Sequence, residues 1–159
     1  MPVVTAELNL APIDLTALAE EVSREIRERE PNRSVEFVID SEMRVLGDQA
    51  LLRTALANLV GNAWKFTSKC VDARIEIGKQ NDECETIFFV RDNGAGFDMK
   101  HAEKLFTVFE RLHRQEEFPG AGIGLATVQR IISQHGGRIW AEGRPNQGAT
   151  FFFTLPSET

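Results

Sequence analysis

The sequence predicts a two-layer α/β sandwich, in which a mixed, mostly antiparallel sheet of about five strands carries three main helices on one face. Segments with apolar residues at helical intervals alternate irregularly with short strand-like runs, several of them spaced for hairpins. Such an order is typical of a sheet covered by helices on one side. The chain has 159 residues, of which 42% are hydrophobic and 26% charged, so one domain with its own core is expected.

Three long helices and one short helix are expected from apolar periodicity and from end signals. Asp14 and Asp48 stand where the first two helices begin, and an aspartate there accepts hydrogen bonds from free N–H groups of the first turn. Gly136-Gly137 suits the end of the third helix. The expected helices cover residues 15–29, 49–66 and 122–135, with a short amphipathic helix at about 100–112.

Strands are expected where β-rich or alternating runs lie between polar turns. Residues 35–39 and 43–46 are expected to form a hairpin. Residues 74–79 are expected to pair with residues 86–90 through the turn at Asn81-Asp82. The other extended segments are expected at residues 1–13, 138–141 and 149–155.

Composition excludes several classes of function. The net charge of −6 and the pI of about 5.1 argue against a nucleic-acid-binding surface. No run approaches the roughly 18 apolar residues of a membrane helix, and the N-terminus lacks a signal-peptide pattern. Cys70 and Cys84 lack metal-ligand spacing. We therefore expect a cytoplasmic domain with two reduced thiols and no membrane contact.

The second helix carries a polar stripe beside its apolar one. Asn58, Asn62 and Lys65 fall at i, i+4 and i+7, so that the last two lie within about 40° of Asn58, and the stripe lies about 100° from the core-facing residues. An asparagine oxygen suits Mg²⁺, and a lysine neutralises phosphate charge. The alternative is that both asparagines only bind helix ends or water. The core-facing residues are Leu52, Leu56, Leu59, Ala63 and Phe66.

A glycine turn follows the buried strand that ends at Asp92. The sequence there is Asp92-Asn-Gly94-Ala-Gly96, and the glycines permit positive φ and close backbone approach. A carboxylate held at a strand end can accept a hydrogen bond from an exocyclic amine, which would select adenine over guanine. The alternative is a tight turn that only joins two elements.

A long charged segment separates this turn from a second glycine run. The 23 residues between Gly96 and Gly120 are too many for an ordinary connector and indicate a functional loop. Within it Arg111 could stabilise a γ-phosphate, or it could be a solvated surface arginine. Gly120-Ala-Gly122-Ile-Gly124-Leu125 then opens a helix, whose N–H groups and dipole favour phosphate. A Rossmann fingerprint is disfavoured because no strand directly precedes these glycines.

These motifs, in this order, resemble the catalytic and ATP-binding domain of sensor histidine kinases, of the superfamily shared with DNA gyrase, MutL and heat-shock chaperone ATPases. The resemblance covers about residues 8–156, and Phe109 to His113 is most similar to phytochrome-associated kinases. It implies a Bergerat-type sandwich with an ATP lid at about residues 97–121. The matching motifs are Asn58–Thr67 (N-x-x-x-N-A-x-K-F-T), Asp92–Phe97, Phe106–Arg111, Gly120–Leu125, His135–Glu142 and Gly148–Pro156.

The resemblance also implies ATP and Mg²⁺ as cofactors and a role for each motif residue. Asn62 would bind Mg²⁺, while Asn58 and Lys65 would lie near the phosphates. Phe66 would lie against the adenine and Asp92 would bond its amino group. Lys65 and Arg111 are the phosphate-stabilising candidates, and no catalytic set is complete within the chain. The residues that would shape the nucleotide pocket and lid hinges are Gly94, Gly96, Gly120, Gly122, Ile123, Gly124 and Leu125.

The histidine that accepts phosphate in these kinases is not expected in this chain. Of the three histidines, His101 and His113 fall in the lid and His135 at a helix end. We therefore expect residues 1–159 to be a single ATP-binding domain without its dimerisation and phosphoacceptor domain. The implied partners are that dimerisation domain and, downstream, a response regulator.

Three other readings of the same motifs remain open. A gyrase-type ATP-hydrolysing clamp carries a glutamate base where Asn58 stands, and asparagine cannot take a proton from water at neutral pH. A protein-serine kinase of the anti-sigma kind fits the phenylalanine motif poorly. A nucleotide-binding regulatory module, in which ATP only orders the lid, is the non-enzymatic alternative.

Overall fold

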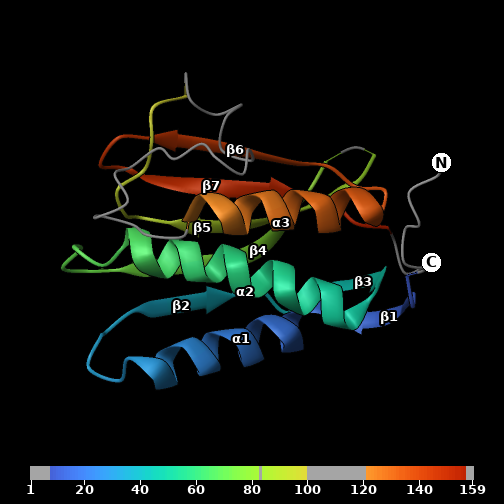
Figure 1. The fold of residues 1–159 in the computed structure, drawn as a ribbon, viewed down its shortest axis with the longest axis horizontal. Helices are drawn as coiled ribbons and strands as arrows, with labels where there is room; N and C mark the ends of the chain where they lie inside the picture. Colours follow the sequence, from blue (N-terminus) through green and yellow to red (C-terminus); the bar gives the residue numbers. More distant parts are fainter. Residues whose placement is uncertain (1–7, 83, 100–120, 157–159) are drawn as a thin grey trace.

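The structure is a computed structural model that describes residues 8–82, 84–99 and 121–156. Two sheets and three helices make up this part of the chain (Figure 1). The elements, in chain order, are β1 (Ala11–Asp14), α1 (Leu15–Arg29), β2 (Glu36–Ile39), β3 (Arg44–Gly47), α2 (Gln49–Phe66), β4 (Arg74–Asn81), β5 (Thr86–Asp92), α3 (Ala121–Gln134), β6 (Ile139–Arg144) and β7 (Gly148–Phe153).

The main sheet has five strands in the order β2-β4-β5-β7-β6. The pair β2–β4 is parallel and the other three pairs are antiparallel. The helices lie side by side on one face of this sheet, with α2 in the middle (Figure 1). The expected two-layer sandwich, with a mixed and mostly antiparallel sheet of five strands, is confirmed.

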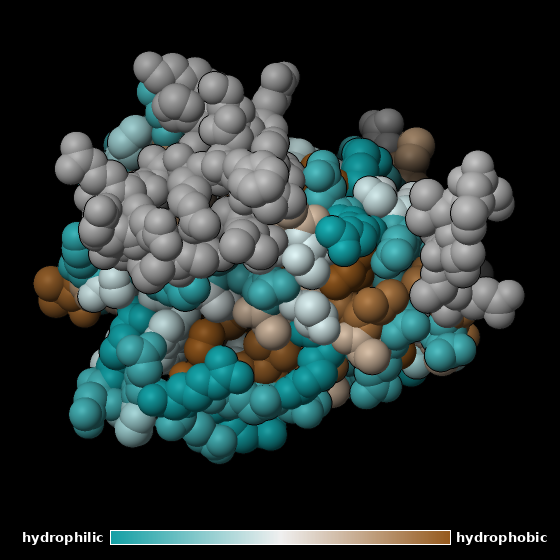
Figure 2. All heavy atoms as spheres, viewed as in Figure 1, coloured by the Kyte–Doolittle hydropathy of each residue, from teal (hydrophilic) through white to brown (hydrophobic). Residues whose placement is uncertain are grey.

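The core lies between the helices and the sheet. Its fully buried side chains come from both layers, for example Leu56 and Leu59 of α2 against Ile75 and Ile77 of β4. Burying each such side chain contributes roughly 1.5–3 kcal/mol, which outweighs the local preferences of single residues. Figure 2 shows the result on the helical face, where hydrophobic residues appear in strips between the helices and hydrophilic residues cover the outward side of α1.

The helix ends follow the expected caps. Asp14 accepts a hydrogen bond from Ala17 N at 3.0 Å. Asp48 accepts one from Leu51 N at 3.1 Å, and backbone N–H groups of Asn9 and Leu51 lower the pKa of its carboxyl. The third helix ends one residue earlier than expected. There Gly136 has φ of +78°, and Gly137 N donates to Ile132 O, the arrangement that closes many helices.

The expected hairpin between residues 35–39 and 43–46 is wrong. β2 pairs in parallel with β4, while β3 pairs with β1 in a separate two-stranded antiparallel sheet. The connection between β2 and β3 is hydrogen-bonded to the first turn of α1 and does not form a hairpin turn. Thr16 Oγ1 donates to Asp40 O at 2.8 Å and accepts from Met43 N at 3.0 Å, so one helix residue separates the two strands.

The later strand pairs agree with the sequence. β4 and β5 pair antiparallel from Ile75–Asp92 to Asn81–Thr86, as expected. β6 and β7 form the closing pair, and β6 runs on to Arg144, so its turn is shorter than expected. Cys70 and Cys84 are both free thiols. The short helix expected at residues 100–112 lies outside the described residues. Within the described part of the chain, no helix is both long and apolar enough to cross a membrane.

Candidate functional site

The C-terminal half of α2 is where the sequence motifs meet. A Cβ atom built on Gly124, in the first turn of α3, would lie 3.4 Å from Asn58 Oδ1. On the other side, Ala95 N of the first glycine turn donates to Phe66 O at 3.0 Å. Both glycine motifs, 28 positions apart at Gly96 and Gly124, therefore contact the same helix. The fold brings together residues that the sequence only predicts to act jointly.

Asn62 has an unusual environment. Its side chain is 4% exposed, and its Nδ2 atom has no hydrogen-bond partner among the described residues. An unpaired buried amide costs about 1–3 kcal/mol, so the position is explained best by a ligand that completes its bonding. The amide oxygen of the same side chain suits Mg²⁺. Within the described ranges, no group of three or more His, Cys, Asp or Glu side chains could hold a metal, so a cation here would depend on Asn62 and a bound anion.

The neighbouring residues of α2 differ in exposure. Asn58 is half-buried, Lys65 is exposed and Phe66 is buried. Lys65 and Asn62 lie about one turn apart on α2. At this spacing the long cationic side chain of Lys65 can reach a ligand bound at the amide of Asn62.

Asp92 ends β5 with its carboxylate in the protein interior. It is 5% exposed, and Oδ1 accepts a hydrogen bond from Gly94 N at 2.8 Å. Burial raises its pKa to about 6, and the N–H groups of Gly94 and Ala149 oppose that rise. The carboxyl is therefore mainly ionised at neutral pH and keeps acceptor capacity for a ligand amine.

The first two glycines permit close packing within the protein. A Cβ atom on Gly94 would lie 2.2 Å from Phe66 O. Gly96 has φ of +65°, and a Cβ atom there would lie 1.9 Å from Arg144 O. Their smallness thus holds the turn after β5 against α2 on one side and against the β6–β7 turn on the other. Any contact of this turn with a ligand depends on that packing.

The second glycine motif is described only in part. Gly122 and Ile123 lie in the first turn of α3, which begins at Ala121. The side chain of Leu125 is 2% exposed and packs in the core, so its backbone is the part that a ligand could meet. Gly120, Arg111, the phenylalanine motif and residues 100–120 of the expected lid lie outside the described residues.

His135 has a structural role, because its ring is buried and both of its nitrogens are engaged in contacts within the protein. It is 4% exposed, its Nε2 accepts a hydrogen bond from Asp48 N at 3.0 Å, and its Nδ1 lies 2.8 Å from Ile131 O. These bonds require a neutral ring with the proton on Nδ1. A buried imidazole ring whose two nitrogens are both engaged is not accessible to accept a phosphate group. His101 and His113 lie outside the described residues.

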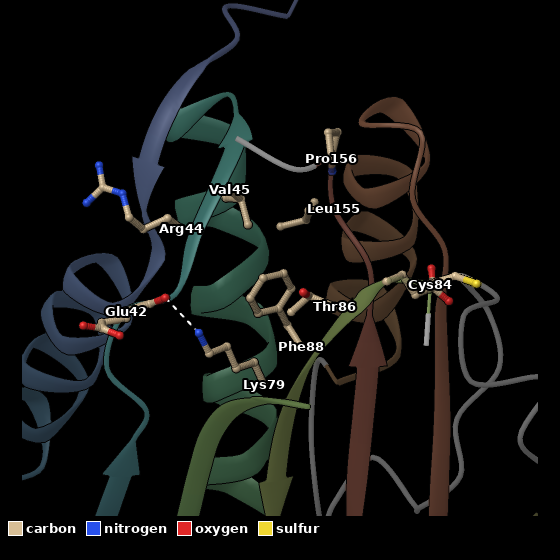
Figure 3. A pocket seen from close by; sticks show the side chains of 10 residues that line it. Glu42, Arg44, Val45, Lys79, Cys84, Thr86, Phe88, Leu155 and Pro156 are labelled. Atoms are coloured by element: carbon tan, nitrogen blue, oxygen red, sulfur yellow. Dashed lines mark hydrogen bonds between the residues drawn. The ribbon is translucent and has the colours of Figure 1, made fainter. Parts of the chain in front are cut away.

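A cavity separate from the predicted site lies at the opposite end of β5 from Asp92 (Figure 3). It holds about 350 Å³, and its apolar wall includes Phe88 and Leu155. At its rim Lys79 Nζ donates to Glu42 O at 3.0 Å. None of the predicted site residues lines it.

The family of the chain is established by comparison. Residues 47–159 match the family of histidine kinase-, DNA gyrase B- and HSP90-like ATPases, and the chain belongs to that family. It is 39% identical over 131 residues to cyanobacterial phytochrome A of Nostoc sp., a match that covers 82% of this chain and 17% of the phytochrome. It is 43% identical over 114 residues to the methanogenesis regulatory histidine kinase FilI of Methanothrix harundinacea, covering 72% of this chain and 13% of FilI. The chain thus spans less than a fifth of either relative's length.

Solved structures of histidine kinases share the fold. Full-length ShkA in complex with AMPPNP matches with a TM-score of 0.77 at 30% identity, covering 94% of this chain and 31% of ShkA. The catalytic domain of histidine kinase ThkA also matches at 0.77, with 28% identity and coverage of 94% and 96%. ThkA in complex with the response regulator TrrA matches at 0.74 and 25% identity, covering 94% and 42%. The expected resemblance to histidine kinases, including the phytochrome-associated group, is confirmed.

Proposed function

We propose that this chain is the ATP-binding catalytic domain of a two-component sensor histidine kinase. It would bind Mg-ATP beside α2 and donate the γ-phosphate to a histidine on a dimerisation domain outside residues 1–159. A response regulator would take the phosphate in turn, in line with the ThkA–TrrA complex. The observation that carries the proposal is that both glycine motifs contact α2, at Asn58 and at Phe66, on either side of Asn62, whose buried amide nitrogen has no partner among the described residues.

The residues of the site would divide the work on ATP. Asp92 would accept the adenine amine, and Phe66 would lie beside the base. Asn58 and Lys65 would lie near the phosphates, and Mg²⁺, held through Asn62, would neutralise part of their charge. The backbone of Gly122, Ile123, Gly124 and Leu125 would face the phosphates with the positive end of α3. From the lid, Gly120 and Arg111 would complete the site.

The nature of residue 58 supports a phosphate donor over a hydrolase. An amide cannot remove a proton from water at neutral pH, so Asn58 cannot serve as a general base. ATP bound here would remain intact until a nucleophile from another domain reaches it. We also propose that the domain works in the cytoplasm, where Cys70 and Cys84 would remain reduced.

Labelling in trans tests the proposal. The purified chain, incubated with γ-labelled ATP and Mg²⁺, is expected to show negligible label on itself. A supplied histidine kinase dimerisation domain is expected to become labelled, with an acid-labile and base-stable product. An acid-stable product would point to serine, and free phosphate without labelled protein would point to a hydrolase.

The control for this assay is Asn62→Ala. Loss of the magnesium ligand is expected to abolish Mg²⁺-dependent ATP binding by calorimetry and to leave the fold intact by circular dichroism. Unchanged affinity would refute the ligand assignment. ATP binding without transfer to any dimerisation domain would favour the regulatory module.

A further inference from the structure

We propose that Arg33, in the turn between α1 and β2, is a positioning residue for the nucleotide site. The inference rests on the proposed function, because it concerns how the ATP-contacting end of α2 is held in place. Arg33 lies outside all of the motifs. Arg33 is half-buried, and its side chain reaches α2 at Trp64, which lies 31 positions further along the chain.

The end of α2 has carbonyl groups that need partners. The last four carbonyls of any α-helix lack acceptor bonds from within the helix. Two of them in α2 are bound locally by the residues that follow it. Thr67 N donates to Ala63 O at 3.1 Å, and Ser68 N donates to Lys65 O at 3.1 Å.

The other two carbonyls each have a partner from a distant segment, and Trp64 O also lies 3.1 Å from the hydroxyl of the nearby Thr67. Arg33 Nη1 donates to Trp64 O at 2.6 Å. Ala95 N, from the turn after β5, donates to Phe66 O at 3.0 Å. The last turn of α2 is therefore held between the α1–β2 turn and the first glycine motif, and each supplies one hydrogen bond to it.

Arg33 makes two further contacts at the same place. Its Nη2 donates to Thr67 Oγ1 at 3.1 Å, and its guanidinium carbon lies 4.3 Å from the centroid of the Trp64 ring. The indole N–H of Trp64 donates to the Glu30 carboxylate, and Phe37 stacks on the same ring with an angle of 15° between the planes. A cation at a helix C-terminus is favoured by the helix dipole as well. These contacts form a cluster around a Trp64 that is itself only 4% exposed.

The cluster and the nucleotide residues share the C-terminal end of α2, from Asn62 to the cap residue Thr67. Trp64 stands between Asn62 and Lys65 in the sequence, and Thr67 directly follows Phe66. Because these residues are joined by one short stretch of backbone, loosening of Trp64 O would displace the residues that would contact the magnesium and the base. In catalysis a misplacement of about 1 Å can cost about 100-fold in rate, and we expect a smaller loss in affinity for the same reason, because the contacts to the ligand are misplaced. Arg33 thereby acts on ATP without touching it.

Arg27 provides a matched control on the same side of the molecule. Its Nη2 donates to Val35 O at 3.1 Å, and its guanidinium carbon lies 4.8 Å from the centroid of Phe37. It thus combines one carbonyl bond with one cation–π contact, as Arg33 does. These contacts join α1 to β2 and to the residue before it, and none is made to α2 directly; Arg27 meets the cluster only through Phe37, which stacks on Trp64.

The test compares Arg33→Ala with Arg27→Ala. Affinity for Mg-ATP is measured by calorimetry, and the free energy of unfolding by urea denaturation. Both variants are expected to lose stability, whereas only Arg33→Ala is expected to raise the Kd, by about tenfold. Arg33→Lys keeps the charge but lacks the planar fork that reaches Trp64 O and Thr67 Oγ1 together, so it is expected to restore the affinity only in part.

Several results would overturn the inference. Wild-type affinity in Arg33→Ala, or an equal loss in Arg27→Ala, would show that Arg33 only stabilises the fold. If Arg33→Ala does not fold, Arg33→Lys decides, and an affinity equal to that of the wild type would refute the role. A wild-type chain that binds no Mg-ATP would contradict the proposed function instead, so the two failures are distinguishable.

Discussion

Asp92 shows how burial changes the chemistry of a single residue. An exposed aspartate is ionised throughout the physiological range, but this one has a pKa near 6 because its carboxylate is removed from water. The folded state holds this proton more tightly than the unfolded chain. Its contribution to stability is therefore greatest below the ordinary aspartate pKa of 3.8 and is lost as the pH rises through the folded-state pKa of about 6.

The same pKa predicts the pH dependence of nucleotide binding. Only the ionised carboxylate is an acceptor on both oxygens, so the Kd for Mg-ATP is expected to rise about tenfold between pH 7 and pH 5. Calorimetry over this range measures it. Asp92→Asn is the control, because its residual affinity should follow only the ionisation of the nucleotide. Parallel profiles for the two proteins would exclude Asp92 as the adenine acceptor.

At the scale of the element, α2 combines a structural stripe with the stripe that we propose binds the ligand. Leu52, Leu56 and Leu59 bury one side, while Asn58 and Asn62 lie at the border of the buried surface. Both of the glycine motifs pack against this helix. Its stability and its exact end therefore matter more to the site than those of any other element.

Two glycines near the site are predicted to respond oppositely to alanine. Gly61 lies inside α2, and a Cβ atom there meets nothing within 4 Å, so Gly61→Ala is expected to raise the free energy of unfolding by about 0.5–1 kcal/mol. Gly94→Ala is expected to lower it by about 1–3 kcal/mol, because the new Cβ would lie 2.2 Å from Phe66 O. Urea denaturation measures both. A stable Gly94→Ala variant would show that the turn after β5 can move away from α2.

At the scale of the whole molecule, His135 ties the end of α3 to the beginning of α2. Its Nε2 accepts the N–H of Asp48, the residue that caps α2, and its Nδ1 pairs with Ile131 O of α3. The two helices that carry the asparagine and second glycine motifs are thus joined at the ends remote from the proposed nucleotide site. That bond helps to keep their other ends at the spacing that Asn58 and Gly124 require.

Loss of this tie is predicted to destabilise the domain. His135→Ala leaves the N–H of Asp48 without its acceptor, and the expected loss is about 1–3 kcal/mol in the free energy of unfolding. Ser133→Ala, at an exposed position of the same helix, is the control and is expected to stay within about 0.5 kcal/mol of the wild type. If the two variants have equal stability, the histidine bond adds nothing to the fold.

Local signals explain why much of this molecule was predictable. Asp14, Asp48 and Gly136 are end signals whose effect depends on the adjacent backbone, and the helices indeed begin and end beside them. The pairing of β4 with β5 was predictable for the same reason, because their turn is short. The predicted hairpin between residues 35–39 and 43–46 was wrong because the segment between them is bonded to Thr16. That residue is distant in sequence, so no local signal reveals its contacts.

The sequence by itself determined the helices, the three motifs and the family, since each depends on residue types at short spacing. Only the tertiary structure decided which distant groups meet. It placed Asn58 beside Gly124, left the amide nitrogen of Asn62 buried without a partner in the described part of the chain, and brought Arg33 to Trp64 O. Such contacts arise when many apolar side chains pack at once, and no short stretch of residues encodes them.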